Sequence, residues 1–120
     1  MAKILIHLTH GLEGPTQADR AFLIARTAIE EGHSVSMFLA GEAVKLIKDE
    51  TMDMVLGFGP VLRAYYDAIV KGGGKIYLSR ISCESRGVTD DDLKGKAVEK
   101  ASPNVLVQLT VDHDRVITYG

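Results

Sequence analysis

The chain of 120 residues has a single cysteine, Cys83, and no tryptophan. One cysteine cannot form an internal disulfide, and a reduced thiol fits a cytoplasmic protein, so we expect that location. No apolar run approaches the roughly 18 residues that a membrane-spanning helix needs, and the amino terminus lacks the apolar core of a signal peptide. We therefore expect no membrane partner.

The sequence also lacks an excess of charge of either sign. Its 14 basic and 16 acidic residues give a formal net charge of −2. Nucleic-acid binding depends strongly on lysines and arginines that displace counterions from phosphates, so we expect no nucleic-acid partner. The length and the 46% hydrophobic content fit one globular domain that spans residues 1–120.

Short segments rich in β-branched and aliphatic residues predict the strands of this domain. They are Lys3–Thr9, His33–Ala40, Lys75–Ser79, Lys96–Ala101 and Arg115–Tyr119. The first two are continuously apolar, as is typical of strands covered on both faces. Because a helix is expected between them, they form a strand–helix–strand unit, which predicts an α/β fold with a parallel sheet.

Apolar residues at helical spacing predict the helices. The first should begin near Thr16, where Asp19 completes a capping box. The loop before the third helix carries an apolar patch, Met52–Phe58, which fits a lid or a subunit contact. The last helix should follow Pro103, although the valines there also alternate as in a strand. The other expected helices are Gly41–Asp49, a segment from Pro60 to the glycines at 72–74, and Thr89–Gly95.

Cys83 follows the predicted strand Lys75–Ser79, and we expect it in the loop beyond that strand. Open α/β sheets bind their ligands outside the carboxyl ends of the strands, so Cys83 is a candidate catalytic nucleophile. Arg80 and Arg86 would support its thiolate form by their charge, while Glu84 opposes them. The alternative is that Cys83 is a small buried hydrophobic residue, as free cysteines often are.

The loop after the first predicted strand should open on the same edge of the sheet, with His10 and Gly11 lining a possible pocket. It has neither of the glycine patterns typical of nucleotide-binding loops. His7 and His10 are three residues apart and share a face only if the strand has already turned, so we expect no metal and no cofactor. A metal or nucleotide sensor built on residues 7–14 is a third hypothesis.

A series of short motifs then becomes recognisable by its order along the chain. Together with the position of Cys83, these motifs resemble the DsrE/DsrF-like family of small sulfur-relay proteins. The resemblance covers nearly the full chain. The motifs are Leu8-Thr-His-Gly11, Gly32-His-Ser-Val35, Gly41-Glu-Ala-Val44, Ile76-Tyr-Leu78, Arg86-Gly87-Val88 and Asp114-Arg-Val-Ile-Thr118.

This resemblance implies a three-layer α/β/α sandwich with a mainly parallel sheet of about five strands, assembled into trimers or hexamers. It further implies that Cys83 accepts persulfide sulfur from a donor protein and passes it to an acceptor thiol. Several relatives carry a second cysteine three positions earlier, where this chain has Arg80. The alternative of the same fold is a non-enzymatic oligomeric protein that binds a small molecule or serves as a scaffold.

Overall fold

A five-stranded sheet runs through the centre of the molecule, and the computed structural model describes all 120 residues. Every neighbouring pair of strands is parallel, so the mainly parallel sheet implied by the resemblance is confirmed. The spatial order is β4-β3-β2-β1-β5. The strands are β1 (Lys3–Leu8), β2 (Ser34–Leu39), β3 (Lys75–Ser79), β4 (Val98–Ala101) and β5 (Arg115–Tyr119), close to the predicted segments.

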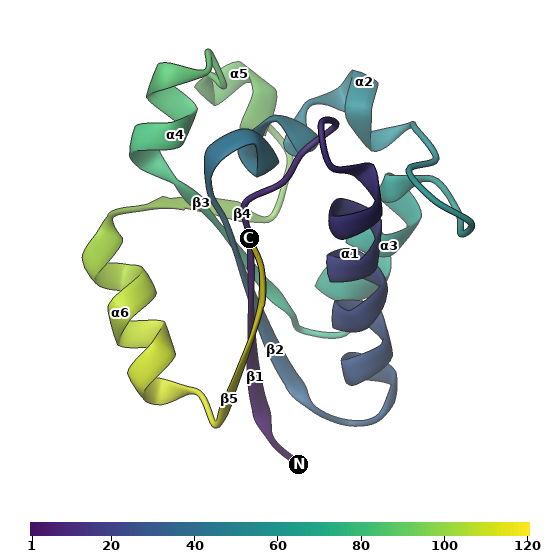
Figure 1. Cartoon of the computed structure of the whole chain (residues 1–120), viewed down its shortest axis with the longest axis vertical. Coiled ribbons are helices and arrows are strands. Elements are labelled where there is room, and N and C mark those ends of the chain that lie inside the picture. Colours follow the sequence, from purple (N-terminus) through teal and green to yellow (C-terminus); the bar gives the residue numbers. More distant parts are fainter.

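Helices cover both faces of this sheet, which confirms the three-layer architecture (Figure 1). Helices α1 (Pro15–Glu30) and α3 (Leu62–Lys71) lie side by side on one face. Helix α6 (Pro103–Asp112) covers the other face, so the helical prediction after Pro103 is confirmed over the strand alternative. No helix is both long enough and apolar enough to cross a membrane.

Four short helices lie beyond the carboxyl ends of the strands, at the top of Figure 1. They are the 3-10 helix η1 (Gly41–Ile47), α2 (Asp49–Met52), α4 (Arg80–Ser85) and α5 (Asp90–Leu93). The α-helix predicted over 41–49 is thus a 3-10 turn followed by a separate short helix. Helix α5 has the predicted cap, because the backbone N–H of Thr89 donates to the Asp92 carboxylate over 2.8 Å.

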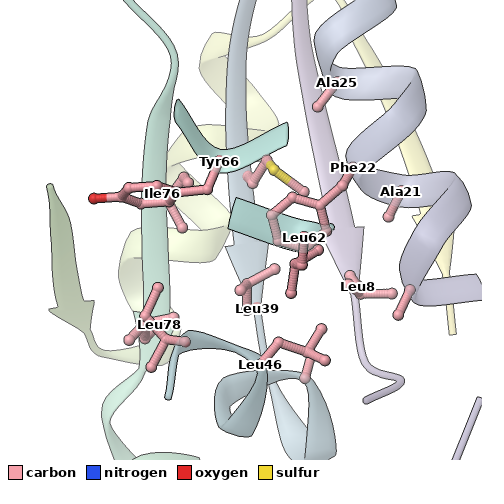
Figure 2. Packing of buried hydrophobic residues seen from close by; sticks show 14 of the residues in the cluster. Leu8, Ala21, Phe22, Ala25, Leu39, Leu46, Leu62, Tyr66, Ile76 and Leu78 are labelled. Atoms are coloured by element: carbon pink, nitrogen blue, oxygen red, sulfur yellow. The ribbon is translucent and has the colours of Figure 1, made fainter. Parts of the chain in front are cut away.

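The strands alternate their side chains between two hydrophobic clusters. Ile6 and Leu8 of β1 belong to the larger cluster under α1 and α3 (Figure 2), whereas Leu5 belongs to the smaller cluster beside α6. Each fully buried leucine or isoleucine stabilises the fold by about 1.5–3 kcal/mol. Both faces of β1 are therefore buried, as its continuous apolar sequence predicted.

Helix α1 begins differently from the predicted capping box. Its first residue is Pro15, its N-cap is Gly14, and no side chain caps it. Proline suits this position because its missing N–H has no helical acceptor there. A side chain at Gly14 would lie 2.8 Å from Nδ1 of His10, so a larger residue at the N-cap would have to displace the His10 side chain. Asp19, predicted as the capping acid, is instead buried with 8% of its surface exposed.

The loop between α2 and α3 spans residues 53–61, shifted toward α3 from the predicted 50–59. Helix α3 begins at Leu62 rather than at Pro60, with Val61 as its N-cap. The backbone N–H of Leu62 donates to the carbonyl oxygen of Met54 over 2.9 Å and closes the base of the loop. The tip of this closed loop carries Phe58, whose side chain is fully exposed.

Candidate functional site

Cys83 lies in α4, directly after β3, and not in the loop expected from the sequence. The Ser79 side chain caps this helix by accepting a hydrogen bond from the backbone N–H of Ser82 over 3.2 Å. The Ser82 hydroxyl in turn accepts a hydrogen bond from the backbone N–H of Gly41 over 2.9 Å. These bonds fix the cysteine-bearing turn to the carboxyl end of β2.

The Cys83 side chain points into the protein. It is 1% exposed and belongs to the larger hydrophobic cluster, together with Leu78 and Val88. The backbone N–H of Val88 donates to the Cys83 carbonyl over 3.0 Å and closes the chain behind the helix. In this structure Cys83 therefore matches the description of a small buried hydrophobic residue.

The electrostatic environment of Cys83 favours the thiol over the thiolate. Burial raises the pKa of Cys83, because an ionised sulfur would lose its hydration. The positive charges of Lys100 and Arg80 lower this pKa, and the negative charges of Asp92 and Glu84 raise it. The resulting pKa of Cys83 is higher than that of an ordinary cysteine, so the reactive thiolate is scarce at neutral pH.

Arg86, expected from the sequence to support the thiolate, forms an ion pair with Glu42. Its Nε donates to Oε2 of Glu42 over 2.7 Å, and Glu42 also pairs with Lys45 over 3.0 Å. The hydrogen bond from Arg86 lowers the pKa of Glu42, ahead of a second from Lys45. Arg86 therefore ties the end of α4 to η1, while Arg80 contributes only its charge to the thiol.

Lys100 is the cation that lowers the pKa of Cys83 most, and no sequence motif pointed to it. The register of β3 and β4 places Lys100 opposite Leu78. Its ammonium group also pairs with the Asp90 carboxylate over 2.8 Å. Only the pairing of two strands that are distant in sequence brings this lysine near the cysteine.

His10 and Gly11 reach the predicted edge of the sheet but line none of the three cavities of the chain. The His10 ring bonds to the Glu13 carboxylate over 3.0 Å, and this bond raises the pKa of His10. A side chain at Gly11 would lie 2.4 Å from the backbone oxygen of Glu42. The space beside Gly11 is thus filled by η1 rather than left open to a ligand.

The histidines do not assemble a metal site. His7 stacks edge-on against Phe38, with ring centroids 6.0 Å apart, and its burial lowers its pKa. No three His, Cys, Asp or Glu side chains gather in a set that could hold a metal ion.

The largest cavity lies elsewhere, between α1 and the loop before α3, with a volume of about 390 Å³. Asp19, Arg20 and Arg26 of α1 line it, together with Tyr65 of α3. The helical spacing predicts that these residues lie on helices, but it does not predict a cavity. The signal that was available is the pair Gly57 and Gly59 in the facing loop, where side chains would collide with Asp19 and Tyr65.

Comparison with solved structures places this fold among proteins of the same architecture. The chain is similar to the ychN protein from E. coli, with a TM-score of 0.81, 20% identity, and coverage of 99% of this chain and 100% of that one. A protein of unknown function from Bacteroides thetaiotaomicron, BT1422, has a TM-score of 0.73 at 14% identity and covers 98% and 95% of the two chains.

A third similar structure is MTH1491 from Methanobacterium thermoautotrophicum, also of unknown function, with a TM-score of 0.75, 10% identity and coverage of 99% and 100%. At such identities the likeness shows the fold alone. A search among curated proteins gives no match. The model of the DsrE/DsrF-like family matches residues 2–119, which is nearly the whole chain. This chain therefore belongs to the DsrE/DsrF-like family.

Proposed function

We propose that this protein acts by binding a small molecule and not by covalent sulfur transfer. In this proposal residues 1–120 form one cytoplasmic domain, and Cys83 is part of its hydrophobic core. The observation that carries it is the burial of the only thiol, 1% exposed within the larger hydrophobic cluster. The cavity beside α1 offers the polar groups that a binding function needs.

Sulfur transfer makes two demands that Cys83 does not meet in this conformation. The donor persulfide must approach the sulfur in line, and the sulfur must be ionised to attack. Core packing blocks the approach of a donor persulfide, and the raised pKa of Cys83 keeps the sulfur protonated. Sulfur transfer would therefore require α4 to move so that Cys83 leaves the hydrophobic cluster.

The reactivity of the native thiol tests this proposal. Because Cys83 is the only cysteine, a chromogenic disulfide reagent reports on this one residue without background. We expect the folded protein to react at least about 100-fold more slowly than the protein unfolded in guanidinium, since the sulfur must await an opening of the structure. Equal rates in the two states would show an accessible thiol and overturn the proposal.

A second candidate function is sulfur relay, and the position of Cys83 at the carboxyl end of β3 in a DsrE/DsrF-like chain favours it. In this mechanism the Cys83 thiolate attacks the terminal sulfur of a donor persulfide. The donor thiolate leaves, and the sulfur remains on Cys83 as a persulfide. An acceptor thiolate then removes that sulfur and regenerates the Cys83 thiolate. Arg80 would support the thiolate through its charge, and the six-residue helix α4 would have to open first.

The proposal also includes self-association into a trimer or hexamer. Large apolar side chains are exposed on separate parts of the surface, with Phe58 fully exposed and Val111 of α6 82% exposed. Single exposed apolar residues are common on monomers, so this part of the proposal rests on membership of the DsrE/DsrF-like family, whose members assemble into homo-oligomers. Light scattering on the purified protein gives the mass in solution, and a monomer at micromolar concentration would refute this part.

A further inference from the structure

We propose that the cavity between α1 and the loop 54–61 binds a zwitterionic small molecule of the amino-acid type, its carboxylate held by Arg26 and its ammonium group by Asp19. This inference rests on the proposed binding function and deepens it by naming the class of ligand. Helix α1, which lines the site, lies apart from α4, the helix that carries Cys83 (Figure 1).

One face of α1 forms the wall of this cavity. Asp19, Leu23 and Arg26 are spaced by four and three residues, so they lie along the same side of the helix. The loop 54–61 faces them and is held closed at its base by the bond between Leu62 and Met54. The volume of about 390 Å³ lies within the range of small-molecule sites.

Asp19 is a buried carboxylate without a partner. Only 8% of its surface is exposed, and no hydrogen bond from a side chain or the backbone affects the pKa of its carboxyl group. Arg20 and Arg26 act on it only through their charges, and neither forms an ion pair with it. A buried acidic group is normally paired or hydrogen-bonded, so Asp19 has unused capacity to accept a donor from a ligand.

The loop is shaped around this carboxylate. A side chain at Gly57 would lie 2.5 Å from Oδ2 of Asp19. Glycine at this position therefore allows the loop backbone to pack closely against the acid, and the small part of Asp19 that remains exposed lines the cavity. The free space next to Asp19 is left to the cavity.

Arg26 supplies the opposite charge, also with an unused donor. Its Nε is buried and has no hydrogen-bond partner. Its guanidinium carbon lies 4.6 Å from the centre of the Tyr65 ring, a cation–π contact that holds the group in place. Tyr65 itself is 1% exposed, with its hydroxyl against Gly59. Arg26 lines the cavity and forms no ion pair there, so its positioned guanidinium group is suited to a carboxylate.

The two charges together select the ligand class. A simple anion would bind Arg26 but would be repelled by ionised Asp19, and a simple amine would face the converse repulsion from Arg26 and Arg20. A molecule with both a carboxylate and an ammonium group can pair with Arg26 and with Asp19 at once. Leu23 and the exposed ring of Phe58 also line the cavity, so the ligand is expected to carry an apolar side chain.

Binding is tested on the full chain with L-leucine, L-methionine and L-phenylalanine, by calorimetry and by NMR shift changes in α1 and the loop. Two analogues of leucine match its shape and lack one charge: 4-methylpentanoate lacks the amine, and 3-methylbutylamine lacks the carboxylate. We expect at least one amino acid to bind, and for leucine we expect each analogue to bind at least 10-fold more weakly. Sulfate serves as the probe for a simple anion site.

Variants locate the site. Asp19→Asn preserves the shape of the side chain and is expected to weaken binding at least 10-fold, as is Arg26→Lys, which keeps the charge but loses Nε. Glu30→Gln, at the exposed end of the same helix, should leave binding unchanged. No binding by any amino acid, or equal binding by sulfate or a leucine analogue, would overturn the ligand class. The proposed function is tested by a separate measurement, the reactivity of the native Cys83 thiol.

Discussion

Replacing Cys83 with serine is expected to lower the free energy of unfolding by about 2 kcal/mol. The substitution keeps nearly the same shape but introduces a hydroxyl into an apolar cluster, where leaving a polar group unpaired costs about 1–3 kcal/mol. Urea denaturation followed by circular dichroism measures the difference, with the midpoint shifting at constant slope.

The matched control is Glu84→Gln, one position further along the same helix and exposed to solvent. Exposed substitutions usually change stability by less than about 0.5 kcal/mol, so this variant should unfold like the parent. If Cys83→Ser changes the free energy of unfolding as little as the control does, the sulfur does not lie in the core, and Cys83 has no structural role.

Replacing Asp19 with asparagine is expected to have the opposite effect and to stabilise the protein by about 1 kcal/mol at pH 7. Burial raises the pKa of Asp19, so the folded state binds its proton more tightly than the unfolded state does. Stability from this group is complete below the ordinary pKa of an aspartate and is lost as the pH rises through the raised value. At neutral pH the fold therefore carries an unfavourable buried charge, which asparagine removes.

This effect is measured by urea denaturation of both proteins across pH 3 to 8. The gap between the variant and the parent should widen as the pH rises through the raised pKa of Asp19 and then stay constant. Asp91→Asn, which replaces an exposed acid of α5, should show no such gap. A loss of stability in Asp19→Asn at pH 7 would mean that the ionised carboxylate has a favourable partner, which would contradict the account of an unpartnered acid.

These two substitutions separate residues kept for the fold from residues kept for binding. Cys83 stabilises the structure in its native form, so changing it should cost stability. Asp19 destabilises the folded chain at neutral pH, and a buried acid with a raised pKa in a cavity is typical of functional sites. A residue that weakens the fold but strengthens a ligand complex fits the binding function proposed for the cavity.

The sheet was predictable because its signals are local. The continuous apolar runs at β1 and β2 reflect burial on both faces, and the spacing of strand, helix and strand enforces parallel pairing. The cap of α5 was predictable for the same reason, since Thr89 and Asp92 lie within one helical turn. In each case the residues that make the interaction are close in the sequence.

The site was less predictable because its determinants are distant in sequence. The polar stretch around Cys83 favoured a loop, yet the Ser79 cap and the bond from Gly41 to Ser82 fold it into a helix that buries the sulfur. The sequence predicts Asp19 as a capping acid, since Thr16 three residues earlier fits that pattern. Pro15 moves the helix start by one residue, and Asp19 turns inward to a loop more than 30 residues away.

The most direct test of the central claim is sulfur loading of the native protein. The reduced chain is incubated with a cysteine desulfurase and cysteine, and intact and peptide mass spectrometry then report sulfur added at Cys83, with Cys83→Ser as the control. We expect the folded chain to stay unmodified under conditions in which a small-molecule thiol accepts sulfur from the same donor. A reducible sulfur adduct on Cys83, absent from the variant, would contradict it and establish that the residue accepts sulfur, as the relay mechanism requires.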